Sequence, residues 1–189
     1  MADHPVTEYA RRVVSGDLRP RCCMWEILAC QRHLDDLERA GTRDFPYVFD
    51  ETRANRIYRH FALIPRLDVP NEKIVLEDWQ QFDYGSIFGW VHTDTGKRRF
   101  KTAYDRIARG HAKTTGAAAI GNYFMLGDAL YPPWHPELAT YEMAPEINIV
   151  AVDRQQGARV REDIANMALS VPAFSERLLV KNSYINDLS

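Results

Sequence analysis

A lysine followed by two threonines opens an alanine-rich stretch in this 189-residue sequence. The Lys113 ammonium group can bind terminal phosphates, and the Thr114 hydroxyl can ligate Mg²⁺. Residues 101–108 before it are typical of a short strand, and residues from 114 onward are typical of a helix packed on a sheet. A helix start directs backbone N–H groups and a positive dipole end at an anion. This order of elements predicts a phosphate-binding loop at residues 109–115.

The loop departs from the usual glycine-rich phosphate-binding pattern at two positions. Where that pattern has glycine, this sequence has Ile107 and Ala112. Gly110 supplies the backbone freedom, so the loop must either turn differently or tolerate Ala112 close to a phosphate. A solvent-exposed helix start with no ligand therefore remains the alternative.

An aromatic residue and an amide lie next to each other about thirty residues before the lysine, at Trp79 and Gln80. A glutamine amide can donate to and accept from the edge of adenine while an aromatic ring packs nearby. The pair is therefore a candidate adenine site, and a helix-capping or surface glutamine is the alternative.

Composition favours a soluble globular protein. Hydrophobic residues make up 46% of the chain, charged residues 26%, and the net charge is −2. This balance lacks the strongly positive charge of a protein that coats DNA, although it allows a local basic patch. The sequence has no apolar run of about 20 residues and no signal peptide at its start, so we expect an intracellular protein.

Three cysteines lie within nine residues, at Cys22, Cys23 and Cys30. Their odd number favours reduced thiols, as in a cytosolic helix. A zinc site would need a fourth ligand, for which His33 is the one nearby candidate, and buried free cysteines are the favoured interpretation.

Helical patterns dominate the first seventy residues, and strand patterns appear near the other end. Predicted helices cover residues 7–14, a stretch after Pro20, 51–62 and 155–169, and predicted strands cover 147–152, 178–180 and 184–185. We expect the stretch after Pro20 to bury one apolar face formed by Met24, Trp25, Ile27, Leu28, Leu34 and Leu37. The region from 127 to 146 contains clustered prolines and is predicted to be a long surface loop.

The acidic pair needed for hydrolysis beside a phosphate-binding loop is missing. Asp153 follows an apolar run, but no second acid follows it, so it does not fit the acidic pair that holds Mg²⁺ and polarises water. We therefore expect very weak hydrolysis by this chain alone.

A set of short segments has the same order as in a known family. They are YAR at 9–11, VVSG at 13–16, ACQRHLDDL at 29–37, FP at 45–46, FD at 49–50, DWQ at 78–80, IFGW at 87–90, RRF at 98–100, AR at 108–109 and VAVDRQQ at 150–156. The chain resembles the amino-terminal part of the large terminase subunit of tailed phages, the ATPase that drives genome packaging. A helicase-like RecA ATPase would share the loop but would not predict the RHLDDL and FGW segments.

The resemblance implies an α/β fold. It would be a RecA-like P-loop ATPase core with an incomplete parallel sheet and flanking helices, preceded by a helical segment. The implied division is a helical lead segment at 1–70 and the first part of the ATPase domain at 71–189, without its Walker B half and nuclease domain. The family carries a two-metal nuclease in a carboxyl-terminal domain, and this sequence lacks a carboxylate cluster suited to it. The resemblance therefore implies a fragment, a truncated gene product or one part of a split subunit.

The resemblance also implies ATP and Mg²⁺ as ligands. Gln80 would read adenine, Lys113 and Thr114 would serve the β- and γ-phosphates and Mg²⁺, and Arg109 would contact the γ-phosphate. Lys113 and Arg109 would be the catalytic residues, whereas His111 would line the loop without a catalytic role. The full implied nucleotide site is Trp79, Gln80, Arg109, Gly110, His111, Ala112, Lys113, Thr114 and Thr115.

In the family, this segment couples ATP hydrolysis to translocation of double-stranded DNA into the prohead. The implied partners are double-stranded DNA, the portal protein, the small terminase subunit and a ring of further copies, with no membrane. The implied location is the host cytoplasm and, transiently, the portal vertex of the prohead. The alternative is a catalytically inactive terminase fragment that acts only in portal or small-subunit binding.

Overall fold

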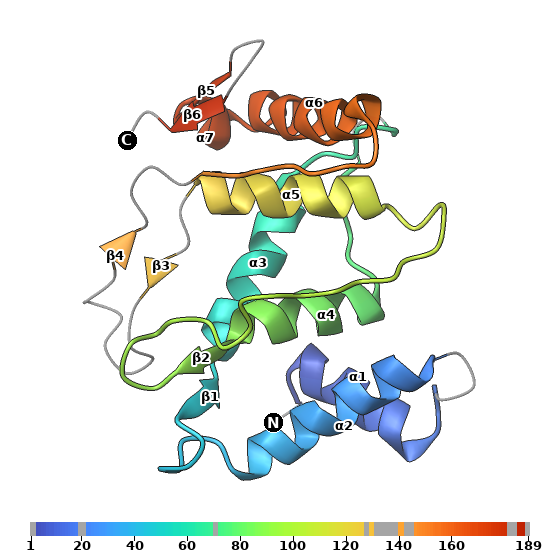
Figure 1. Cartoon of the computed structure of the whole chain (residues 1–189), viewed down its shortest axis with the longest axis vertical. Helices are drawn as coiled ribbons and strands as arrows, with labels where there is room; N and C mark the ends of the chain where they lie inside the picture. The colour runs from blue at the N-terminus through green and yellow to red at the C-terminus, as the bar shows by residue number, and fades with distance from the viewer. Residues whose placement is uncertain are drawn as a thin grey trace. The chain divides into compact units, whose positions relative to one another are not determined.

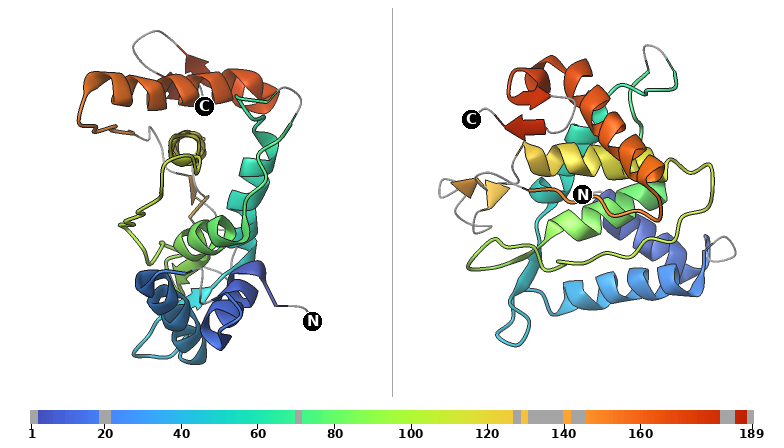
Figure 2. Two further views of the ribbon diagram at one scale, coloured as in Figure 1. Left: turned by 90° about the vertical axis from the view of Figure 1, so that its right-hand side faces the viewer. Right: turned by 45° about the horizontal axis from the view of Figure 1, so that its top comes forward.

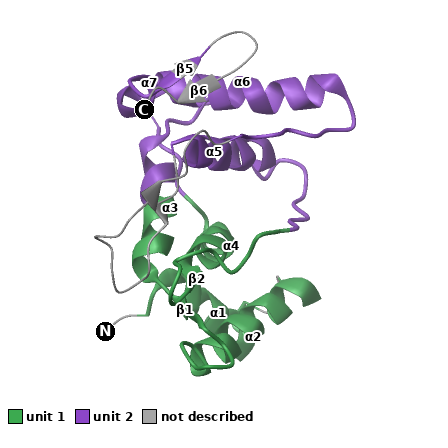
Figure 3. Cartoon of the chain, turned by 60° about the vertical axis from the view of Figure 1, so that its left-hand side comes forward, with its two compact units in different colours: residues 1–58, 76–103, 130–139 green, residues 59–75, 104–129, 140–189 purple. Residues whose placement is uncertain are grey.

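The structure is a computed structural model that describes residues 3–18, 22–69, 72–126, 129–130, 140–141, 146–180 and 185–187. Two compact units interleave along the chain (Figure 3). Unit 1 contains residues 1–58, 76–103 and 130–139, and unit 2 contains residues 59–75, 104–129 and 140–189. The division at residue 70 stays a prediction.

Helices make up most of the described chain, and all elements are labelled in Figure 1. In chain order they are α1 (Pro5–Ser15), α2 (Met24–Glu38), β1 (Tyr47–Phe49), α3 (Glu51–Leu63), α4 (Asp78–Gly89), β2 (Trp90–His92), α5 (Lys113–Met125), β3 (Ala129–Leu130), β4 (Thr140–Tyr141), α6 (Arg154–Ser170), α7 (Pro172–Ser175), β5 (Leu178–Val180) and β6 (Ile185–Asp187). These bounds confirm the helices predicted at 7–14, after Pro20, at 51–62, from 114 and at 155–169.

The first helix packs its apolar face against α2 and α4. Proline occupies the first position of α1, and Gly16 ends the helix in the left-handed region with φ 109°. Val6, Ala10 and Val13 are fully buried and join Cys30 and Phe82 in one cluster. The periodic apolar positions of α1 therefore build the core of unit 1.

The apolar face predicted for α2 divides in the structure. Its buried residues are Cys30, His33 and Asp36, and Ile27 packs partly buried against the core. Met24, Trp25 and Leu28 instead have exposed fractions of 61%, 72% and 52%. The inward stripe thus combines a thiol, an imidazole and a carboxylate with aliphatic residues, and part of the predicted face points to solvent.

Two glycines allow α4 to approach its neighbours closely. A Cβ atom at Gly85 would collide with the Tyr58 hydroxyl group and with Val6. A Cβ atom at Gly89 would overlap the Phe49 ring and lie 3.1 Å from the Ala54 Cβ. Tyr58 also donates a hydrogen bond of 2.6 Å to the carbonyl oxygen of Gln81. The missing side chains therefore set the packing distance of α4 in unit 1.

Unit 2 is built around the contact between α5 and α6, and α6 crosses over α5 (Figure 2). Gly121 leaves room for Ile164, whose Cδ1 would lie 2.9 Å from a Cβ at position 121. The buried Asn122 amide donates to the carbonyl oxygen of Ile164 at 3.0 Å. From α3, His60 donates to the carbonyl oxygen of Ala119 at 2.9 Å. These contacts combine close helix packing with buried hydrogen bonds.

Two segments predicted as strands have no strand in the structure. Residues 101–108 and 147–152 run without secondary structure, and Val150 and Val152 are 94% and 99% exposed. A β-branched apolar run forms a strand only when neighbouring strands pair with it. The described residues contain three two-stranded sheets, β1–β2, β3–β4 and β5–β6, and the first and last are antiparallel. A RecA-like parallel sheet therefore stays a prediction.

Among the described residues, no helix is both long and apolar enough to cross a membrane.

Replacing Gly85 by alanine is expected to destabilise unit 1 by about 2 kcal/mol, because the added Cβ atom overpacks a filled contact. The measurement is the free energy of unfolding from urea titration. Gly157→Ala in α6 is the matched control, since its Cβ would lie 3.8 Å from that of Ala151. The control is expected to be neutral or stabilising by about 0.5 kcal/mol. Equal stability of the two variants would contradict the proposed close packing of α4.

Candidate nucleotide-binding site

The predicted phosphate-binding loop makes a sharp turn immediately before α5. Gly110 has φ 89°, and Ala112, the residue that precedes the helix, has φ 52° and ψ 30°. Among the described residues, Ala112 is the one residue other than glycine with a positive φ. Its left-handed backbone costs about 1 kcal/mol relative to a glycine. The loop thus adopts a strained turn at the position where the usual pattern has glycine.

The first turn of α5 leaves backbone donors unused by the helix. The first intrahelical bond runs from Gly116 N to Ala112 O at 2.8 Å, and no side chain caps this end. The N–H groups of Lys113, Thr114 and Thr115 therefore lie at the positive end of the helix dipole without an intrahelical acceptor. Residues 109–114 are exposed, and Thr115 is half-buried. An anion can reach these donors from solvent.

Positive charge gathers at this loop. The Lys113 ammonium group folds back and donates to the carbonyl oxygen of Ala108 at 3.3 Å. Arg109 and His111 are exposed, and the sequence has no acidic residue between positions 106 and 127. Arg109 and Lys113 thus lie within five residues of each other at the start of α5, and the nearest acid before them in the sequence is Asp105.

The two residues proposed for adenine recognition lie at the start of α4. The Gln80 side-chain oxygen accepts from the backbone N–H of Glu77 at 3.0 Å. Trp79 is half-buried and packs against the core of unit 1. Gln80 therefore performs the capping role that the sequence left open as the alternative. Gln80 belongs to unit 1 and the loop to unit 2, so its role toward adenine stays a prediction.

The described residues contain no group of three or more histidine, cysteine, aspartate or glutamate side chains arranged to hold a metal ion. Asp153 caps α6, and its carboxylate accepts from Gln156 N at 2.8 Å. Capping explains this aspartate without a role in Mg²⁺ binding. The exposed Thr114 hydroxyl remains the candidate Mg²⁺ ligand within the loop.

Sequence reasoning missed a buried network around His33. The indole N–H of Trp90 donates to His33 Nδ1 at 3.0 Å, and His33 Nε2 lies 3.0 Å from the Thr7 hydroxyl oxygen. Because indole is only a donor, His33 carries its proton on Nε2 and donates it to Thr7. Both ring nitrogens are thus occupied, which argues against His33 as a zinc ligand beside the cysteines. Burial raises the pKa of the Cys30 thiol, as expected for an inert core cysteine.

Comparisons with models of protein families, with curated proteins and with solved structures gave no match for this chain.

Ala112→Gly and Ala117→Gly should have opposite effects on stability. The first removes left-handed strain and is expected to stabilise unit 2 by about 1 kcal/mol. The second places glycine at an exposed position within α5 and is expected to destabilise it by about 1 kcal/mol. Chemical denaturation of both variants measures the difference. Destabilisation by Ala112→Gly would contradict the left-handed conformation of this residue.

Stability of unit 1 should fall between about pH 6.5 and about pH 4. Burial lowers the pKa of His33 to about 4, whereas an unfolded histidine titrates near 6.5. The unfolded state therefore binds the proton first as pH falls, and the loss reaches on the order of 3 kcal/mol. Burial lowers the pKa of His4 as well, so this histidine contributes in the same direction.

Urea titrations at about pH 7 and about pH 4.5 measure this loss. In His33→Gln, an amide can accept from Trp90 and donate to Thr7 without titrating. This control should lose less stability than the natural chain over the same pH interval. An identical loss in both proteins would show that His33 is not the group responsible.

Proposed function

We propose that this chain binds Mg²⁺–ATP as the ATP-binding portion of a phage DNA-packaging motor. The observation that carries the proposal is the loop at residues 109–115, where unused N–H groups of α5 lie beside Lys113 and Thr114. The ordered segments that resemble the terminase large subunit support the choice of motor. ATP hydrolysis in that motor drives double-stranded DNA into the prohead.

Each loop residue has a definite task in this proposal. The Lys113 ammonium group exchanges the Ala108 carbonyl for oxygens of the β- and γ-phosphates. The Thr114 hydroxyl ligates Mg²⁺, and the N–H groups of residues 113–115 donate to the phosphates. Arg109 contacts the γ-phosphate and couples the loss of this phosphate to movement of the motor. Gln80 and Trp79 recognise the adenine base.

Binding is expected to exceed turnover in this chain. The described loop contains no carboxylate that could polarise an attacking water, and Asp153 is occupied as a helix cap. The acids would therefore have to come from elsewhere in the assembly. The proposed partners of the motor are double-stranded DNA, the portal protein, the small terminase subunit and further copies in a ring.

A second function is favoured by one observation, the exposed apolar residues of α2. Met24, Trp25 and Leu28 are each more than half exposed and lie within five residues on one helix. Such a patch is typical of a protein interaction surface. The chain would then be a catalytically inactive terminase fragment that binds the portal or the small subunit through its helical region.

Titration of the purified chain with a fluorescent ATP analogue and Mg²⁺ tests the first function. Lys113→Ala is expected to weaken binding by about 10- to 100-fold, because it removes a charge-assisted contact to phosphate. Thr114→Ala should reduce the dependence of binding on Mg²⁺. Lys73→Ala is the matched control, since Lys73 also donates to a backbone carbonyl, that of Leu63 at 2.7 Å.

Equal affinities of the Lys113→Ala and Lys73→Ala variants would contradict the proposed phosphate site. An absence of nucleotide binding together with a cooperative thermal transition would instead support the interaction function. Binding assays with a portal or small-subunit protein would then compare the natural chain with Trp25→Ser.

A further inference from the structure

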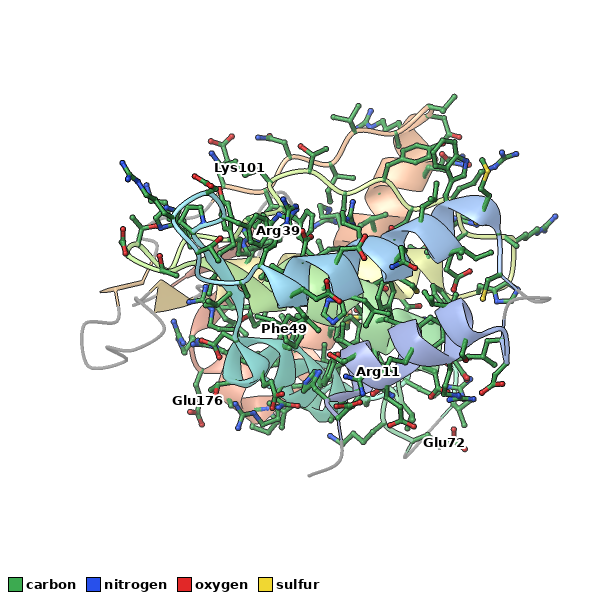
Figure 4. All side chains as sticks on the ribbon, turned by 90° about the horizontal axis from the view of Figure 1, so that it is seen from below. Arg11, Arg39, Phe49, Glu72, Lys101 and Glu176 are labelled. Atoms are coloured by element: carbon green, nitrogen blue, oxygen red, sulfur yellow. The ribbon has the colours of Figure 1, made fainter. Side chains whose placement is uncertain are left out.

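An apolar segment of unit 2 leads into α6 with an open backbone. Residues 147–152 have the sequence INIVAV and run without secondary structure. Among the described residues, their N–H and C=O groups form no backbone hydrogen bond. Figure 4 draws the segment in pale orange, with side chains that project from the ribbon before it enters α6. Because unpaired backbone groups in a β-branched run are a template for strand pairing, this segment can accept a second strand.

The two faces of the segment have different surroundings. A Cβ atom at Gly157 of α6 would lie 3.8 Å from the Ala151 Cβ and 4.0 Å from the Ile149 Cγ2, so these two side chains face the start of α6. Val150 and Val152 alternate with them and are almost completely exposed. Side chains that alternate between a helix and solvent are typical of a strand with one face covered. The segment therefore already has the two-faced character of a strand.

Two opposite charges flank the segment symmetrically about Val150. Glu146 lies four residues before Val150 and Arg154 four residues after it, and residues 147–152 carry no charge. In an antiparallel pair of two copies centred on Val150, Glu146 of each copy lies opposite Arg154 of the other. Opposite charges at directly paired positions stabilise a sheet, and like charges destabilise it. The segment is therefore complementary to itself, as an interface with two-fold symmetry requires.

Other arrangements of the two strands lose this match. A shift by one position places Glu146 opposite Asp153, which is a pair of like charges. A parallel pair in register places Glu146 beside Glu146 and Arg154 beside Arg154. In the register centred on Val150, Asp153 instead lies opposite Ile147 and keeps its role as the cap of α6. Glu146 and Arg154 are both exposed, so both are available to a second copy.

We propose that two copies of this chain associate through residues 146–154, of which 147–152 pair as antiparallel strands about a two-fold axis at Val150. Each strand keeps the α6 helix of its own chain on one face, and a two-stranded ribbon needs such packing to be stable in water. A two-fold pair closes on itself, whereas the ring proposed for the motor requires a head-to-tail contact. The pairing is therefore an interface that the proposed function does not contain.

Sedimentation velocity of the full chain between about 1 and about 200 µM measures this association. The natural chain is expected to form a dimer as its concentration rises. Val150→Lys is expected to weaken the dimer about tenfold or more, because two like charges then meet at the axis. Val75→Lys is the matched control, since Val75 is an exposed valine outside regular secondary structure. This control should leave the dimer unchanged.

Charge reversal tests the register of the two strands. Glu146→Arg alone and Arg154→Glu alone each turn the attractive pairs into repulsive ones, and each is expected to weaken the dimer about tenfold. An equimolar mixture of these two single variants restores opposite charges across the heterodimer and should associate like the natural chain. The double variant, with both reversals in one chain, should also regain the natural affinity.

A monomer at every concentration would overturn the proposal and assign the open strand to a partner other than a second copy. An unchanged dimer in Val150→Lys would also overturn it, because the interface would then lie elsewhere on the chain. Failure of both the mixture and the double variant to associate would overturn the antiparallel register. Thermal melting checks that every variant keeps the natural fold. Val150→Lys should bind the fluorescent ATP analogue like the natural chain, which separates this proposal from the ATP site.

Discussion

Unit 1 depends on an imidazole that is kept neutral within the core. His33 receives the Trp90 indole N–H from β2 and donates to Thr7 on α1, so one side chain of α2 connects three elements. The rings of Phe49 and Trp90 surround it at centroid distances of 5.1 and 5.7 Å. Loss of the imidazole would leave two buried polar groups without partners, which is why these elements must assemble together. One helical turn further along α2, Asp36 forms an ion pair with Arg99 and so holds the segment containing Arg99 against the same helix.

Much of the helical structure was predictable from sequence, because caps and apolar spacing are local signals. The turn at Gly16 and the apolar residues of α1 fix that helix without reference to the rest of the chain. The exposed position of Trp25 was not predictable, since spacing shows that a face exists but not which neighbour covers it. The α4 helix was not predicted because its apolar residues lie on several faces and show no clear helical periodicity. Its two glycines allow close packing in the structure, but in the sequence they do not indicate a helix. Residues 147–152 show the limit for strands, whose formation requires partners distant in sequence.

The candidate site also combines features that the sequence predicts with features that only the structure shows. The order of residues from Gly110 to Thr114 predicts a loop before a helix, and α5 does begin at Lys113. The order of residues did not predict the left-handed backbone of Ala112 or the hydrogen bond from Lys113 back to the Ala108 carbonyl. The networks around His33 and Asp36 join residues 57 and 63 positions apart, so no local pattern could have revealed them. The sequence allowed Gln80 either to recognise adenine or to cap a helix. Its side-chain oxygen accepts a hydrogen bond from the backbone N–H of Glu77, so the capping role is present in the structure.

The Trp90–His33 hydrogen bond also makes the intrinsic tryptophan fluorescence of the protein sensitive to the state of its core. Trp90 is 1% exposed and emits from an apolar core, whereas Trp25 is 72% exposed and emits from water. The sequence contains four tryptophans, so the blue edge of the fluorescence spectrum follows Trp90 and the red edge follows Trp25 only in a variant in which Trp79 and Trp134 are replaced. A protonated imidazole quenches a neighbouring indole, so protonation of His33 is expected to lower the fluorescence intensity of Trp90. In such a variant, a single emission scan distinguishes an event on the surface of α2 from one in the core of unit 1.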